Sequence, residues 1–97
     1  MEPDKIRNLV RNLDSSSFQL RLEIARRLEE LGAGAVPYLI EGLRSDIGMV
    51  RQDCADLLGR LGVKEAIGSL EALLDDDQPG VRACATEAIR KIKNRPD

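Results

Sequence analysis

Apolar and polar residues follow one another along this chain with the period of an amphipathic α-helix, and one apolar pattern occurs three times. Each copy opens with an apolar residue and an arginine, and apolar or small residues follow three, seven and ten positions after the arginine. The arginines are Arg21, Arg51 and Arg82. Steps of three and four residues place side chains on one face of a helix. The pattern therefore predicts three equivalent helices, which we call the first helices.

A second set of apolar stripes alternates with the first. It occupies the segments IRNLVRNL, VPYLIEGL and IGSLEALL. Their last leucines, Leu13, Leu43 and Leu74, each precede by the same distance the apolar residue that opens the next copy. These segments are the second helices. We predict six helices in all, over about residues 4–13, 17–31, 35–44, 48–61, 65–74 and 79–93.

Polar residues suited to N-capping stand before each first helix. Ser16, Asp46 and Asp77 lie five positions before the three arginines. Serine and aspartate side chains accept hydrogen bonds from the unpaired N–H groups of a first helical turn. We therefore predict that these three residues are the N-caps.

The regular repetition of helix pairs decides the architecture. A coiled coil would need uninterrupted heptads, and Gly32, Gly34 and Pro37 break them. A closed six-helix bundle does not require translational repetition, whereas a stack of equivalent pairs does. We predict a single all-α domain over residues 1–97, a right-handed α-α superhelix (α-solenoid) of about three helix pairs.

The segment VRQDCADLLGRLGVKEAIGSLEALLDDD resembles a HEAT-like repeat of the short kind also found in phycobilisome lyases. The likeness rests on its Val-Arg pair, its small and leucine positions, its Leu-Gly pair and its acidic turn. Residues 20–46 are a looser copy and residues 81–92 are half of one. The resemblance implies an armadillo-like fold that most often serves as a protein-binding scaffold. It also implies that the second helices line the concave face.

Charge and composition narrow the partner classes. The net charge is −2, from 15 basic and 17 acidic residues, which argues against a nucleic-acid binder. Four cations near the C-terminus keep a nucleic-acid alternative open: Arg90, Lys91, Lys93 and Arg95. No apolar run approaches the ~20 residues of a membrane span, so no membrane partner is expected. The acidic start and the two cysteines indicate a cytoplasmic protein with reduced thiols.

The residue types expected of a catalytic or metal site are missing. Histidine is absent, which removes imidazole acid–base chemistry and imidazole metal ligands. An EF-hand loop counted from Asp75 fails, because Pro79 and Thr86 stand at two ligand positions. We therefore predict no catalytic residue, no metal and no cofactor, and that the chain is not an enzyme. The same lack of histidine argues against likeness to the HEAT-repeat hydroxylases that hold iron on His-Glu pairs.

A binding surface is expected on the non-core positions of the second helices. Tyr38 is the aromatic residue that we expect to be exposed, and tyrosine is a frequent interface anchor. With Glu41, Asn8 and Arg11 it forms the predicted partner-binding patch. The alternative is that Tyr38 packs along its own helix. The leading functional prediction is a small scaffold or adaptor that binds another protein; the alternative is an accessory subunit or chaperone of a bilin lyase or phycobilisome-handling system.

Three further expectations concern the repeated arginines, the cysteines and the C-terminal end. The arginines either grip a ligand or, as we expect, lie on the helix junction and bond the acidic turns, with Asp46 and Asp77 available. Cys54 should be a core residue that is not bonded to Cys84. The helix over residues 79–93 is the last of the first helices, and no second helix follows to cover it. Ala88 lies beside its stripe of core positions. A weak homodimer through this end and a monomer both stay open.

Overall fold

The computed structural model describes residues 1–96, and the regular structure in this part of the chain is all helical. The α-helices are α1 (Pro3–Arg11), α2 (Phe18–Leu31), α3 (Val36–Gly42), α4 (Gly48–Leu61), α5 (Ile67–Ala72) and α6 (Pro79–Lys93). Short 3-10 turns adjoin them: η1 (Asn12–Asp14), η2 (Gly32–Ala35), η3 (Lys64–Ala66) and η4 (Leu73–Asp75). The predicted all-α solenoid class is confirmed.

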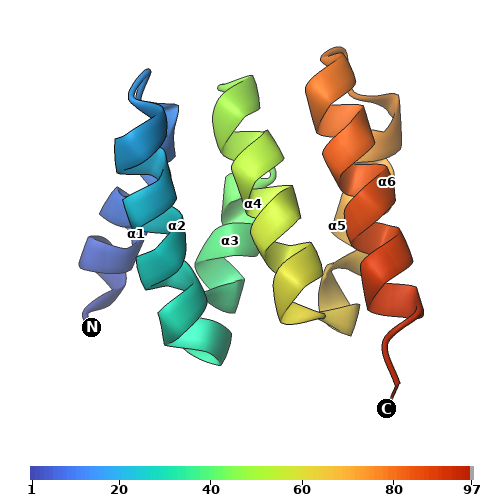
Figure 1. Ribbon diagram of the computed structural model, residues 1–97, viewed down its shortest axis with the longest axis horizontal. Helices are drawn as coiled ribbons and strands as arrows, with labels where there is room; N and C mark the ends of the chain where they lie inside the picture. Colours follow the sequence, from blue (N-terminus) through green and yellow to red (C-terminus); the bar gives the residue numbers. More distant parts are fainter. Residues whose placement is uncertain (97) are drawn as a thin grey trace.

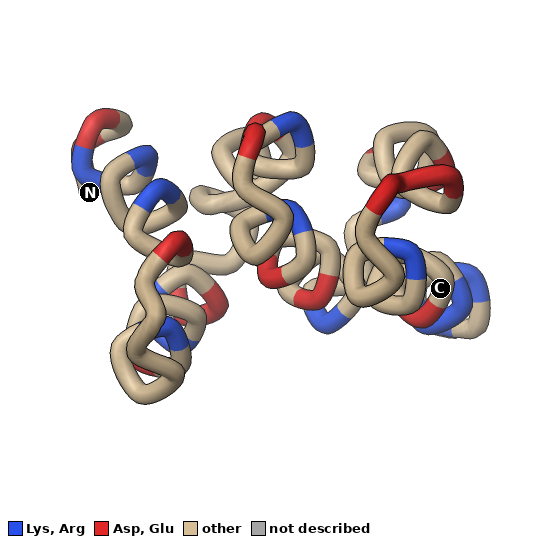
Figure 2. The backbone as a smooth tube through the Cα atoms, turned by 90° about the horizontal axis from the view of Figure 1, so that it is seen from above, with Lys and Arg blue, Asp and Glu red and all other residues tan. Residues whose placement is uncertain are grey.

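The helices form two layers. The first helices α2, α4 and α6 stand side by side in one layer, and the second helices α1, α3 and α5 form the layer behind it (Figure 1). The helix pairs α1–α2, α3–α4 and α5–α6 follow one another in a row when the chain is seen from above (Figure 2). The principal extents are 31 × 30 × 20 Å. A row of this kind leaves one open face along each layer.

The second helices are shorter than predicted. α3 and α5 span seven and six residues, and their neighbouring residues form tighter turns. At the end of α3, the N–H of Arg44 bonds the carbonyl of Glu41, and the N–H of Ser45 bonds the carbonyl of Gly42. These i→i+3 bonds satisfy the last carbonyls in 3-10 geometry. By contrast, α4 and α6 occupy the ranges expected from their apolar pattern.

The turn before each first helix has a repeated hydrogen-bond pattern that differs from the predicted caps. The N-caps are Ser17, Ile47 and Gln78, and only Ser17 accepts a side-chain capping bond. The prediction of Ser16, Asp46 and Asp77 is therefore wrong by one position. The reason is that a polar side chain earlier in each turn accepts from the N–H two residues on, in the pairs Ser15–Ser17, Ser45–Ile47 and Asp76–Gln78.

The three repeated arginines hold these turns. Each guanidinium donates to the carbonyl six residues earlier, at 2.8, 2.8 and 2.6 Å, in the pairs Arg21–Ser15, Arg51–Ser45 and Arg82–Asp76. Arg51 also makes two bonds, of 2.9 and 3.0 Å, to the carboxylate of Asp76 in the next turn. The structural interpretation of the arginines is thus the correct one. The expected pairing was wrong in detail, however, because Arg51 pairs with Asp76 and Asp77 of the next turn and not with Asp46.

The Arg51–Asp76 pair predicts a loss of stability in acid. Hydrogen bonding from Arg51 holds the pKa of Asp76 below its usual value. A carboxylate whose pKa is lower in the folded state stabilises the fold above its unfolded pKa of about 3.9. That contribution disappears as pH falls through the folded pKa. In urea denaturation we therefore expect Asp76→Asn to cost stability at pH 6 and little at very low pH.

Asp75→Asn is the matched control for this experiment. Asp75 is exposed and its side chain makes no ion pair within residues 1–96. We expect its substitution to leave stability nearly unchanged at both pH values. Equal losses for Asp75→Asn and Asp76→Asn, or a loss for Asp76→Asn that persists in acid, would contradict the assigned role of the Arg51–Asp76 pair.

The core runs through both layers and contains no buried charged side chain among the described residues. Its largest fully buried side chains are Leu13, Leu28, Leu39, Leu57, Leu58, Leu70, Ile92, Val81 and Cys54. Burial raises the pKa of the Cys54 thiol to about 12. Cys54 and Cys84 are both free thiols, as predicted.

The contact between α4 and α6 depends on Gly59. A Cβ on Gly59 would lie 2.8 Å from the Cα of Ala88. Ala88 is only 2% exposed because it packs against this glycine. Its expected place at the open C-terminal end was therefore wrong, and Ala88→Arg would disrupt the core.

The outer face of α6 is also more polar than the equivalent face of α4. Where α4 carries Ala55 and Gly59, at four and eight positions after its arginine, α6 carries Thr86 and Arg90, and both are exposed. Because these side chains are larger and polar, another helix could not pack on the outer face of α6 as closely as α6 packs on α4. The outer face of α6 thus lacks the small residues through which α4 packs on α6.

This polar end predicts a monomer. We expect light scattering to give the mass of one chain across a concentration series. A mass that rises with concentration, and that Thr86→Arg returns to the monomer value, would instead show association through α6. Thr86→Arg adds a charge to an exposed position, so it should leave the fold intact.

Candidate interaction site

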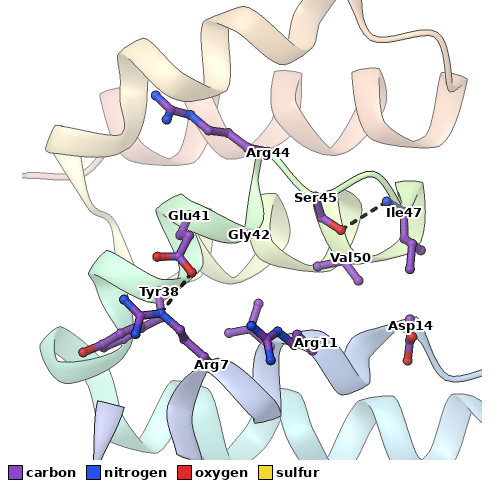
Figure 3. A pocket seen from close by; sticks show the side chains of 11 residues that line it. Arg7, Arg11, Asp14, Tyr38, Glu41, Gly42, Arg44, Ser45, Ile47 and Val50 are labelled. Carbon is purple, nitrogen blue, oxygen red and sulfur yellow. Dashed lines mark hydrogen bonds and ion pairs between the residues drawn. The ribbon is translucent and has the colours of Figure 1, made fainter. Parts of the chain in front are cut away.

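A hollow of about 540 Å³ lies between α1 and α3 and extends to the first turn of α4 (Figure 3). It opens on the layer of second helices, where the sequence predicts a binding surface. Its lining includes Arg7, Val10 and Arg11 of α1, Tyr38 and Glu41 of α3, Arg44 just after α3, and Ile47 and Val50 at the start of α4.

One wall joins α1 to α3 through charge and aromatic contacts. The Arg7 guanidinium donates to the carboxylate of Glu41 at 3.1 Å. The same guanidinium lies 5.2 Å from the centre of the Tyr38 ring, within the range of a cation–π contact. The bond to Glu41 raises the pKa of Arg7. Together these contacts orient the Tyr38 ring at the side of the hollow (Figure 3).

The floor of the hollow is apolar. Val10 and Val50 are buried, and Ile47 at one end is 44% exposed. Gly42 permits this arrangement, since a Cβ there would lie 2.5 Å from the Cys54 sulfur and 2.9 Å from Val10. The absence of a side chain therefore lets α3 approach both α1 and α4. An occupant of the hollow would cover apolar surface.

Arg11 and Arg44 make the rest of the hollow electropositive. Both are exposed, and neither guanidinium forms an ion pair or side-chain hydrogen bond within residues 1–96. The carboxylates that line the hollow belong to Asp14, which is exposed, and Glu41, which Arg7 engages. Three cations thus face two carboxylates in a chain whose net charge is −2.

Three of the four predicted patch residues line this hollow. They are Tyr38, Glu41 and Arg11, whereas Asn8 is exposed and lies outside it. Arg7 takes the place expected for Asn8, and sequence reasoning missed it. The available signal was spacing, because Arg7 lies four residues before Arg11 and therefore on the same helix face. Tyr38 is half-buried beside Arg7, between the exposed and packed alternatives.

The basic C-terminal segment is partly occupied by contacts within the chain. Arg90 pairs with Glu87, and Arg95 donates to the carbonyl of Arg60 at 3.2 Å. Lys91 and Lys93 are exposed. The nucleic-acid alternative stays a prediction, with a smaller set of accessible cations than the sequence indicates.

Residues 1–96 contain no cluster of three cysteine or carboxylate side chains arranged to hold a metal ion. Every helix in this part of the chain falls short of the length and apolar character required to cross a membrane.

The repeats, the two-layered stack and the open second-helix face agree with one family, described as "HEAT repeats", whose sequence pattern matches residues 4–90. The chain belongs to the HEAT-repeat family. The finer likeness of these HEAT repeats to those of phycobilisome lyases stays a prediction. Deoxyhypusine hydroxylase from Candida albicans is a relative, 33% identical over 84 residues. The match covers 84% of this chain and 26% of that protein, so the chain spans about a quarter of the relative's length.

This relative corrects the prediction that the chain is not an enzyme. It also corrects the exclusion of likeness to HEAT-repeat hydroxylases, since the relative is named as a hydroxylase. That exclusion rested on the absence of histidine, which rules out histidine chemistry but not likeness in sequence to an enzyme. Repeat architecture is set by small and apolar positions, which scaffolds and enzymes share, so it does not separate these two classes.

Proposed function

We propose that this HEAT-repeat chain binds a partner protein in the hollow between α1 and α3. The observation that carries the proposal is the convergence of Arg7, Tyr38 and Glu41 from two helices above an apolar floor. Contacts among these three side chains hold the wall in place before any partner binds, which lowers the entropic cost of association. A volume of about 540 Å³ falls within the range of about 300–1,000 Å³ typical of ligand sites.

Tyr38 is the proposed anchor of this interaction. Tyrosine combines a large apolar ring with a polar hydroxyl, and it is a frequent anchor residue in protein interfaces. Here Arg7 lies over the ring, so the remaining ring surface and the apolar floor are open to a partner. A partner would therefore make its main apolar contact on the Tyr38 side of the hollow.

An adaptor needs a second surface, and the opposite layer supports this part of the proposal. A smaller cavity of about 210 Å³ lies between α2 and α4, lined in part by Phe18, Leu22 and Met49. Phe18 is 70% exposed, with the Arg21 guanidinium 5.6 Å from its ring centre. Its location on the other layer would allow two partners to bind at once.

Affinity capture with mass spectrometry from the native host tests the proposal. The bait is the intact chain, compared with Tyr38→Ala and with a control, Arg26→Ala/Arg27→Ala. Arg26 and Arg27 are exposed on α2 and make no ion pair within residues 1–96. We expect a specific partner that the wild type and the control both recover and that Tyr38→Ala loses.

Two results would contradict the proposed site. Equal recovery by Tyr38→Ala and wild type would place the interaction outside the hollow. Failure to recover any specific protein, at several salt concentrations, would count against a partner-binding role. Circular dichroism of each variant shows that the helices are intact before recovery is compared.

A further inference from the structure

The hollow has two cations that the fold itself leaves unpaired. Within residues 1–96, ion pairs occupy the guanidinium groups of Arg7, which lines the hollow, and of Arg21, Arg51, Arg60 and Arg90. Arg11 and Arg44 line the hollow without such a partner. Arg11 projects from α1, and Arg44 lies just after α3 with its side chain directed away from α1, so the two cations lie at separate edges of the hollow (Figure 3).

The hollow is positively charged, whereas the chain as a whole is negatively charged. The chain as a whole is acidic, with a net charge of −2, which disfavours non-specific attraction of anions. Within the hollow, Arg7 already neutralises Glu41, and Asp14 lies at an exposed edge in η1. Three cations against two carboxylates leave one excess positive charge in the lining, which Arg11 and Arg44 supply. An occupant that carries carboxylates would complement it.

The floor between these cations selects against a purely ionic occupant. Val10, Ile47 and Val50 present apolar atoms, and a small anion bound to the arginines would leave them uncovered. A peptide can satisfy both features, because neighbouring residues supply a carboxylate and an aliphatic or aromatic side chain. A nucleic acid could supply negative charge, but the hollow lacks a row of aromatic side chains for base stacking.

We propose that the hollow binds an acidic peptide segment of the partner. Carboxylates of this segment contact Arg11 and Arg44, and an apolar side chain between them packs on the floor formed by Val10, Ile47 and Val50. This inference rests on the proposed partner-binding function and names the chemistry of what is bound.

Fluorescence anisotropy with synthetic peptides tests this chemistry on the intact chain. The probe is a labelled peptide in which Asp and Glu alternate with Leu and Phe. One control peptide replaces the acidic residues by Lys, and a second replaces the apolar residues by Ser. We expect the probe to bind at least about tenfold more tightly than either control, since both the charge and the apolar contact contribute.

Two charge-matched double variants locate the binding. Arg11→Glu/Arg44→Glu reverses the unpaired cations of the hollow, and Arg26→Glu/Arg27→Glu makes the same change in net charge on the exposed face of α2. None of the four side chains makes an ion pair within the described residues, so both variants should fold. We expect the first to weaken probe binding by more than about tenfold and the second to change it much less.

Several outcomes overturn the inference. Equal weakening by the two double variants would mean that attraction is non-specific. Tighter binding of the Lys peptide, or of a single-stranded oligonucleotide, would assign the hollow to a different partner class. Binding of the Ser peptide as tight as that of the probe would remove the role of the apolar floor.

A peptide library without charge bias separates this inference from the proposed function. The displayed library is selected on the wild-type chain, and each selected peptide is tested against Tyr38→Ala. Peptides that depend on Tyr38 and are rich in acidic residues support both statements. Peptides that depend on Tyr38 but are not acidic keep the proposed function and refute the acidic chemistry. Selected peptides that bind without regard to Tyr38 count against the hollow itself.

Discussion

Leu58→Ala should lower the free energy of unfolding by about 2–5 kcal/mol, the range for a buried leucine truncated to alanine. Leu58 is fully buried in α4, the helix that packs between the first and last pairs. It stands seven positions after Arg51, where the other copies have Leu28 and Ile89. Removing its side chain leaves a cavity, and the surrounding helices can fill it only by moving inward at the expense of their other contacts. Urea denaturation followed by circular dichroism measures the change.

Tyr38→Ala is the comparison for Leu58→Ala. Tyr38 is half-buried at the side of the hollow, and its ring contacts the guanidinium of Arg7, which is not a core side chain. Its removal should therefore cost much less than removal of Leu58. Similar denaturation midpoints for the two variants would mean that the buried and binding faces have been exchanged in our assignment. Unchanged m values would show that both variants unfold from the same kind of folded state.

Gly59→Ala should destabilise the protein by about 1–3 kcal/mol, the usual cost of overpacking a close contact. The sign is informative, because alanine is a better helix former than glycine by about 0.8–1 kcal/mol. A Cβ on Gly59 would meet the backbone Cα of Ala88 at 2.8 Å, and backbone cannot rotate away as a side chain end can. We therefore expect the steric cost between α4 and α6 to exceed the gain in helix propensity.

Gly68→Ala provides the matched control for Gly59→Ala. Gly68 lies within α5, and a Cβ there would have no neighbour within 4 Å. The substitution should stabilise the protein by up to about 1 kcal/mol through helix propensity alone. Opposite signs for the two variants in the same urea experiment would confirm the close contact of α4 with α6. Stabilisation by Gly59→Ala would show that the helices can separate at no cost.

The architecture was predictable because it depends on a period. Apolar steps of three and four residues, repeated at matching intervals, fix which face of each helix is buried, and Cys54 and Leu58 lie where that period places them. The turns were harder. Three consecutive serines precede α2, and any of them could accept a backbone hydrogen bond at similar energy. Which one caps the helix depends on the path of the turn, which Arg21 fixes by bonding the carbonyl of Ser15.

The hollow was only partly predictable for a similar reason. Exposed positions on a second helix identify Tyr38, Glu41 and Arg11, but they do not show which side chains meet across two helices. The Arg7–Glu41 contact joins residues 34 positions apart and depends on how α1 packs beside α3. Likewise, Arg51 finds Asp76 through stacking of the repeats, where the sequence offered the nearer Asp46. The sequence pattern predicts which side chains one helix exposes, whereas the contacts between repeats can be found only from the packed structure.

The two junctions in the row of helix pairs differ in kind, and this difference has a consequence for cooperativity. The α4–α6 junction combines close helix packing at Gly59 with the Arg51–Asp76 pair. At the α2–α4 junction, Glu29 stands where α4 has Gly59, and the contacts include Arg21–Asp53 at 3.6 Å and Arg60–Glu29 at 3.3 Å.

In a linear array, stability is a sum of the contributions of the units and of the junctions between them. The α2–α4 junction is the weaker one because it lacks the close helix packing found at Gly59, so local opening begins there. Amide hydrogens of α1 and α2 should therefore exchange before those of α4 and α6. The hollow spans this weaker junction, with Arg7 on α1 and Glu41 on α3. A ligand that bridges them binds only the closed arrangement and so slows the opening of α1 and α2, by mass action. Occupancy of the hollow would thereby make the whole row unfold more nearly as one unit.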